Sequence, residues 1–268
     1  MLIRRLIFIG FAFATFHAAA ADNAAQQAPQ TTPQRVLFVG NSFSYFNNGL
    51  HNHVSSLIKA AGKWQTGTNR YRLKTLSGGR LAEHVDGFSS LIKQPTGREW
   101  DVVVIQGHSS EPVEPKRQAG FIRAANELIK QVRQHKATPV LFMTWGYAGQ
   151  PEMAQMLADN YVQLGNAQNA LVVPVGLAFA HSARQHPEIN LYSPDVSGFD
   201  EAGNTIYDAT IKHPSLAGTY LAACMFYATF YQQSPLGLAY TAGLDKSTAE
   251  ALQRQAWQTY TQFYGEAK

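Results

Sequence analysis

The feature that most constrains the fold is an alternation between short apolar runs and longer amphipathic segments. Strand-like segments occur at 35–40, 71–76, 100–106, 138–145 and 170–176, and most of them are apolar runs. Apolar residues at helical spacing occupy 48–61, 79–93, 117–135, 151–168, 177–186, 215–231 and 246–264. Strands that are apolar along their whole length are typical of parallel sheets, which are covered by helices on both faces. The alternation therefore predicts a three-layer α/β/α sandwich with a mostly parallel, five-stranded, flavodoxin-like sheet.

One segment departs from this alternation. Between 190 and 212, two short β-prone pieces flank a Gly-Asn turn, which predicts a small hairpin inserted in a loop. Long loops in compact domains are often functional. Because no repeat or second composition regime is visible, we expect a single domain over 34–268.

The N-terminus has the pattern of an export signal. A basic start, MLIRR, precedes an apolar run at 6–16 and a series of small residues. This pattern predicts a signal peptide at 1–21, cleaved near Ala21, and a flexible low-complexity leader at 22–33. The chain contains one cysteine, Cys224, in an apolar run where it is expected to pack in the core. A bacterial protein that is periplasmic or secreted fits both observations.

Charge and motifs exclude several classes of function. The net charge is +4 and no Lys/Arg run is present, so we expect no nucleic-acid partner. No stable membrane insertion is expected after signal cleavage. The sequence lacks a Cys/His cluster with metal-ligand spacing and lacks nucleotide-binding glycine motifs, so neither a metal nor another cofactor is implied. The oligomeric state is not indicated.

The first apolar run ends in a turn that carries a serine. Gly40, Asn41 and Ser42 follow this run, at the strand edge where α/β sheets form their sites. A serine hydroxyl becomes a nucleophile only when a base takes its proton. His213 lies in KHPSLAGTYLAA, where Pro214 suits the first turn of a helix. We therefore expect Ser42 to be the nucleophile and His213 its base.

Together, VLFVGNSFS and KHPSLAGTYLAA resemble the SGNH (GDSL-like) hydrolase superfamily, in an exported bacterial form. The resemblance implies the α/β/α fold inferred above and a catalytic serine in the G-N-S turn. It also implies an oxyanion hole built from the N–H of Ser42, a glycine N–H and a third donor. The glycine falls in TLSGGRL, as Gly78 or Gly79, and we take Gly78.

The third block of the superfamily, usually G-x-N-D, is atypical here. The third apolar run ends in QGHSS and has no asparagine. The amide of Gln106 can donate as an asparagine does, and QGHSS resembles the Q-G-E-S stretch of carbohydrate O-acetylesterases in the same superfamily. We expect Gln106 to be the third donor, with His108 and Ser109 as alternatives.

The last block, usually D-x-x-H-P, is atypical as well. Thr210 lies where the acid should be, and a threonine cannot stabilise an imidazolium as a carboxylate does. We take Asp208 as the acid, with Asp195 as an alternative if the hairpin is inserted between acid and base. A Ser–His dyad without an acid is the third possibility.

These residues predict a serine esterase that hydrolyses carboxylic esters through an acyl-enzyme. O-acetyl or short acyl esters, on small molecules or on saccharides, are the expected substrates. Two alternatives stay open at this point: an acyltransferase of the cell envelope, and an inactive carbohydrate-binding protein that has kept the SGNH fold.

Overall fold

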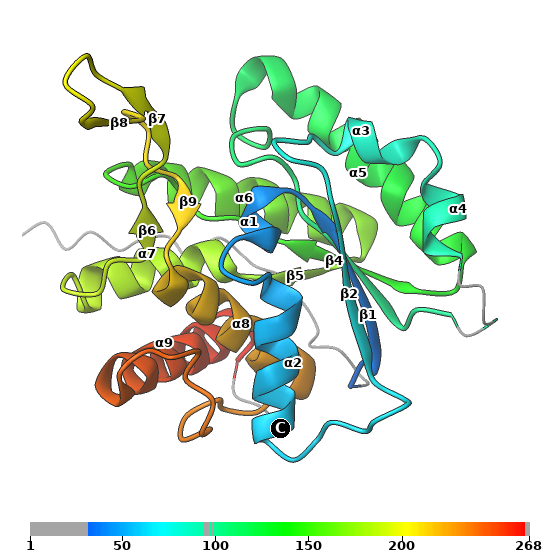
Figure 1. Ribbon diagram of the computed structural model, residues 1–268. Coiled ribbons are helices and arrows are strands. Elements are labelled where there is room, and N and C mark those ends of the chain that lie inside the picture. Colours follow the sequence, from blue (N-terminus) through cyan, green and yellow to red (C-terminus); the bar gives the residue numbers. More distant parts are fainter. Residues whose placement is uncertain (1–31, 94–96, 98, 266–268) are drawn as a thin grey trace, which may run out of the picture.

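A five-stranded parallel sheet forms the centre of the molecule, as predicted (Figure 1). The computed structural model describes residues 32–93, 97 and 99–265; the predicted signal peptide and residues 22–31 of the leader lie outside them. The strands are β1 (Arg35–Gly40), β2 (Arg70–Thr75), β3 (Val102–Ile105), β4 (Thr138–Phe142) and β5 (Leu171–Val173). They are ordered β2-β1-β3-β4-β5, and each neighbouring pair is parallel.

Alternate residues of each central strand enter two separate cores. Val36 and Phe38 of β1 point to one core, whereas Leu37 and Val39 point to the other. The first core is covered by α2 (Leu50–Ala60), α7 (Val175–Gln185), α8 (Leu216–Tyr231) and α9 (Lys246–Tyr264). The second is covered by α3 (Ala82–Val85), α4 (Phe88–Ile92), α5 (Pro115–Gln134) and α6 (Pro151–Gln168). The chain is therefore the three-layer sandwich that the alternating strands and helices predicted.

The helix α8 lies between the sheet and the outer helices of its layer. Every residue from Ala217 to Phe230 is buried, so this helix has no polar face. Cys224 is fully buried within it, as expected for a cysteine that packs in a core. Among the residues that the structure describes, no helix is long and apolar enough to cross a membrane.

One predicted helix is two short ones. The segment 79–93 forms α3 and α4, and the chain breaks between them at Asp86 and Gly87. Asp86 is extended and Gly87 has φ +73°, a left-handed conformation that glycine adopts without steric cost. The sequence therefore predicted the helical spacing of the apolar residues correctly, but the backbone between α3 and α4 is not helical.

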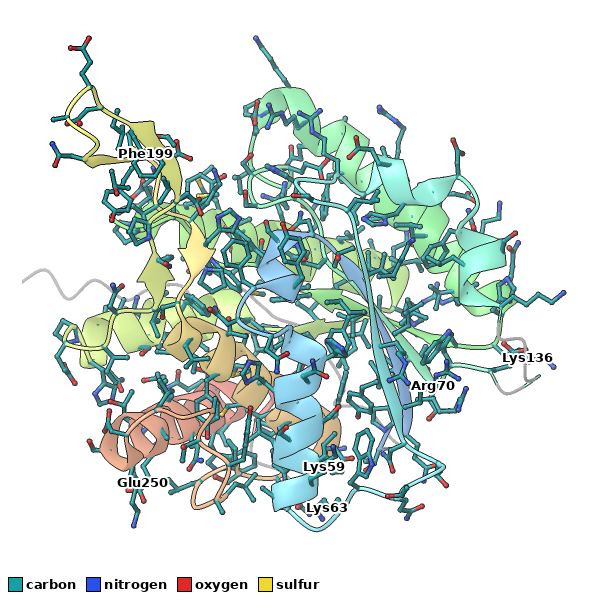
Figure 2. The ribbon with its side chains drawn as sticks, in the orientation of Figure 1. Lys59, Lys63, Arg70, Lys136, Phe199 and Glu250 are labelled. Carbon is teal, nitrogen blue, oxygen red and sulfur yellow. The ribbon has the colours of Figure 1, made fainter. Side chains whose placement is uncertain are left out.

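The predicted hairpin is present and stands away from the sandwich. The strands β7 (Val196–Phe199) and β8 (Thr205–Tyr207) pair antiparallel, and Asp200 accepts turn hydrogen bonds from the N–H groups of Ala202 and Asn204. A two-residue ladder of β6 (Tyr192–Ser193) with β9 (His213–Pro214) closes its base. Figure 2 shows Phe199 on this projecting arm.

Candidate active site

The nucleophile turn follows β1 directly. Asn41 is the N-cap of the short helix α1 (Ser42–Tyr45), and its Oδ1 accepts the N–H of Phe43 at 3.2 Å. Gly40 is required before it, because a Cβ there would lie 2.3 Å from Oε1 of Gln106. Ser42 is therefore held at the carboxyl edge of the sheet, where the sequence placed it.

Ser42, His213 and Asp195 form a hydrogen-bonded chain. His213 Nε2 lies 2.8 Å from Ser42 Oγ, and His213 Nδ1 lies 2.6 Å from Asp195 Oδ1 and 2.5 Å from Oδ2. Because a carboxylate can only accept, Nδ1 carries a hydrogen and donates a hydrogen bond to Asp195. That leaves Nε2 unprotonated and able to accept the hydroxyl proton of Ser42. This is the arrangement in which a histidine activates a serine.

Asp208, the expected acid, does not reach His213. Its side chain is exposed, and its contribution is a backbone N–H that donates to Asp195 O at 2.8 Å. The reason lies in the register of the β6–β9 ladder, which pairs Ser193 with His213 and so brings the nearby Asp195 to the imidazole. The hairpin loops out between Asp195 and Asp208, so the carboxylate nearer in sequence is not the one nearer in space. We expected Asp208 to contact His213, and the structure corrects this: the carboxylate that contacts His213 is that of Asp195.

Aromatic side chains hold the imidazole in place. Phe46 stacks on His213 with ring centroids 4.3 Å apart and planes at 8°. Phe43 meets the ring edge-on at 5.9 Å. With one face and one edge covered and both nitrogens bonded, the His213 ring has a single defined orientation.

Trp145 contacts both the nucleophile turn and the loop that carries His213. It is fully buried and lies in a stack between Phe43 and Phe179, with centroids 4.3 Å apart on each side. Its Nε1–H donates to the backbone oxygen of Lys212 at 2.9 Å, which anchors the loop that carries His213. Trp145 is therefore a packed core residue and not part of the pocket wall.

Gln106, the expected third oxyanion donor, is fully engaged inside the protein. Its Oε1 accepts the N–H of Asn41 at 3.0 Å and the hydroxyl of Ser44 at 2.8 Å. Its Nε2 donates to Asn41 Oδ1 at 2.7 Å and to Gly107 O at 2.6 Å. The residue is 1 % exposed, so no donor faces the substrate side. This corrects the expectation: Gln106 ties the nucleophile turn to the end of β3.

A pocket of about 300 Å³ opens beside Ser42. Its walls are formed by the nucleophile turn, the glycine loop, the loop after β3 and the loop before β9, through Asn41, Ser42, Phe43, Tyr45, Phe46, Ser77, Gly78, His108, Ser109, Lys212 and His213. Of the two candidate glycines, Gly78 lines the pocket and has φ +63°. The N–H of Gly79 donates to Leu76 O, and the carbonyl oxygen of Gly79 accepts a hydrogen bond from Asn41 Nδ2. The structure thus favours Gly78 as the residue that faces the substrate.

The two alternative donors, His108 and Ser109, both reach the pocket. Ser109 Oγ is hydrogen-bonded to Tyr147 OH at 2.8 Å. Nδ1 of His108 is buried and, in the described part of the chain, has no hydrogen-bond partner. Burial, followed by the charges of Arg117, Arg80 and Lys212, lowers the pKa of His108, so its ring is neutral at neutral pH.

Sequence reasoning missed two residues of this region. Lys212 is part of the pocket wall, and its place directly before His213 was the available signal. Glu111 is 4 % exposed, and its Oε2 accepts the N–H of His108 at 3.0 Å, which fixes the loop after β3. Among the described residues, no group of His, Cys, Asp and Glu could hold a metal ion.

Comparison with solved structures identifies the superfamily. A proposed SGNH hydrolase from Slackia heliotrinireducens is 25 % identical over 73 % of this chain and 98 % of that one, with a TM-score of 0.54. The chain belongs to the SGNH hydrolase superfamily. A DUF4886 family protein from Bacteroides uniformis shares the fold at 17 % identity, with coverage of 87 % and 96 % and a TM-score of 0.60.

The same fold occurs in an acetylxylan esterase from Geobacillus stearothermophilus. That structure is 16 % identical, with coverage of 75 % of this chain and 95 % of that one and a TM-score of 0.50. No protein-family model and no curated protein matches the sequence. The likeness to these two proteins is therefore one of fold.

Proposed function

We propose that the protein is a serine esterase that works through an acyl-enzyme. Ser42 attacks the ester carbonyl while His213 Nε2 takes the hydroxyl proton, and Asp195 stabilises the imidazolium that results. His213 then returns the proton to the leaving alcohol. Water, deprotonated by the same imidazole, releases the acid from Ser42. The unbroken chain from Ser42 Oγ through His213 to Asp195 is the observation that carries this proposal.

The oxyanion of the tetrahedral intermediate needs donors aimed at it from the pocket. The N–H groups of Ser42 and Gly78 are two, as the superfamily resemblance implies. For the third we assign His108 in place of Gln106. A neutral imidazole has one N–H, and placing it on Nε2 leaves the buried, unpartnered Nδ1 without a proton. Nε2–H is then the donor that the ring offers to the pocket.

The substrates we propose are small carboxylic esters, with acetyl or short acyl groups on a small molecule or on a saccharide. A pocket of about 300 Å³ suits a group of this size. One structure with the same fold is named an acetylxylan esterase, which is compatible with a saccharide ester. The geometry of the triad supports catalysis over mere binding, because a binding protein has no need of an aligned base.

Hydrolysis of 4-nitrophenyl acetate by the purified protein tests the proposal. Ser42→Ala and His213→Ala should each lower kcat by at least about 10³-fold, because removing a member of a catalytic triad disables the whole unit. Ser110→Ala and His186→Ala are matched controls away from the triad and should keep the wild-type rate. Wild-type rates in Ser42→Ala and His213→Ala would contradict the assignment.

A further inference from the structure

The wall of the pocket beside Ser42 includes a cationic side chain, that of Lys212. Lys212 lines the pocket, and in the described part of the chain it forms no ion pair. Its backbone oxygen is fixed by Trp145 Nε1–H, so the residue is held next to His213. An unpaired ammonium beside a reacting carbonyl is free to bind a charge that the substrate brings.

Two arginines add to this charge from the neighbouring loops. Arg80 follows the glycine loop, and Arg117 lies in the first turn of α5, just beyond the loop that carries His108. Together with Lys212, both act on the His108 ring in the pocket wall and lower its pKa, after burial itself. Three cationic side chains therefore lie close enough to act on the His108 ring, and Lys212 is the one of them that lines the pocket.

The nearby carboxylates are already engaged. Asp195 accepts from His213 Nδ1, and Glu111 accepts the backbone N–H of His108. Glu114 pairs with Arg117 at 2.9 Å. Among the described residues, the Lys212 ammonium thus has no carboxylate as an ion-pair partner.

We propose that Lys212 selects esters carrying a carboxylate or phosphate group close to the scissile carbonyl. This rests on the proposed esterase function and narrows its substrate class. The anionic group has to lie within the pocket, because Lys212 is part of the pocket wall beside Ser42 and His213. The selected substrate is therefore a locally anionic ester, such as an acylated acidic sugar or an acidic half-ester.

Two pairs of esters test whether Lys212 selects anionic substrates. They also show whether the anionic group is recognised in the acyl group or in the leaving group. Monoethyl succinate against ethyl butyrate places the anion in the acyl group. 4-Acetoxybenzoate against its methyl ester places it in the leaving group. For each pair the ratio of kcat/KM, anionic over neutral, is measured in wild type, Lys212→Gln and Lys212→Glu, with Lys130→Gln on the outer face of the molecule as the matched control. Because each ratio is compared between variants, the intrinsic reactivity of the esters cancels.

In at least one pair, the ratio should fall about 5-fold in Lys212→Gln and about 10-fold or more in Lys212→Glu, the size expected for one partly solvated charge pair and its reversal. It should not change in Lys130→Gln. Raising NaCl to about 0.5 M should shrink the wild-type ratio, because salt screens exposed charges. Ratios that stay within twofold of wild type in Lys212→Glu for both pairs overturn the proposal. If 4-nitrophenyl acetate is still hydrolysed in that case, only the anion selectivity fails; if it is not hydrolysed by wild type, the esterase function itself fails.

Discussion

Replacing Asp195 by asparagine tests which carboxylate serves His213. Both carboxylate oxygens lie within 2.6 Å of His213 Nδ1, and the His213 and Asp195 side chains are 14 % and 21 % exposed. At an effective dielectric constant of about 20 and a separation of about 4 Å, the attraction to the imidazolium is worth about 4 kcal/mol. A charge-assisted hydrogen bond of this kind contributes about 1.5–3 kcal/mol net. Partial exposure favours the lower figures, because water screens the pair.

A loss of about 2–3 kcal/mol in the transition state lowers kcat by about 30-fold to 150-fold. Asparagine can also donate to Nδ1 and stabilise the wrong tautomer, which moves the loss towards 10⁴. We therefore expect Asp195→Asn to lower kcat on 4-nitrophenyl acetate by about 10²–10⁴, with KM nearly unchanged.

Asp208→Asn is the matched control, because Asp208 acts through its backbone N–H, which the substitution keeps. Its kcat should stay within about twofold of wild type. Near-ultraviolet circular dichroism of both variants shows whether the fold is preserved. The assignment of Asp195 is refuted if Asp208→Asn loses the activity and Asp195→Asn keeps it. It is also refuted if both variants keep the activity, which is the result expected of a Ser–His dyad.

Three further predictions concern residues around the triad. Gln106→Leu leaves several buried polar groups of the nucleophile turn unpaired, so urea unfolding should show a loss of about 2–4 kcal/mol; an unchanged free energy of unfolding would mean that the network does not hold the turn. Burial raises the pKa of Glu111, so the stability it contributes when protonated is lost as the pH rises through that raised pKa. In thermal melts, Glu111→Gln should therefore gain stability relative to wild type as the pH rises above about 4.5, the ordinary pKa of a glutamate. Equal gains in the control Glu114→Gln would argue against burial as the cause. Phe199, 69 % exposed on the hairpin, packs little on the sandwich, so Phe199→Ser should move Tm by less than about 2 °C, and a larger drop would show that the arm packs on the body.

The elements that local pattern defines could be predicted from the sequence. Four of the five strands, β1, β3, β4 and β5, are largely apolar and buried, whereas β2 is a half-exposed edge strand. The alternation of these strands with helices leaves few alternatives to a parallel sheet. That Ser42 and His213 lie together could be predicted for a similar reason, since each lies in a short motif at the end of a strand or the start of a helix. Their separation in sequence did not matter, because the sheet brings both motifs to one edge.

The carboxylate that contacts His213 could not be predicted from a local motif. It depends on the pairing of Ser193 with His213, a contact between segments on either side of an inserted hairpin. Nothing in the residues of either segment sets that register locally, so distance along the chain favoured Asp208 over Asp195.

The hydrogen-bond partners of Gln106 could not be predicted from the sequence either. Its type showed that it can donate and accept hydrogen bonds, but not that both ends of its amide would be turned inward to Asn41 and Gly107. The same limit applies to His108, because its place in the pocket follows from how the loop after β3 is fixed by Glu111.

The central claim is that His213 makes Ser42 a nucleophile, and covalent labelling tests it most directly. The folded protein is treated with a fluorophosphonate, and the adduct is located by intact-mass and peptide mass spectrometry. We predict one adduct, on Ser42, that is absent in Ser42→Ala and forms far more slowly in His213→Ala and Asp195→Asn. Absence of labelling in folded wild-type protein, or an adduct that persists in Ser42→Ala, would contradict the account.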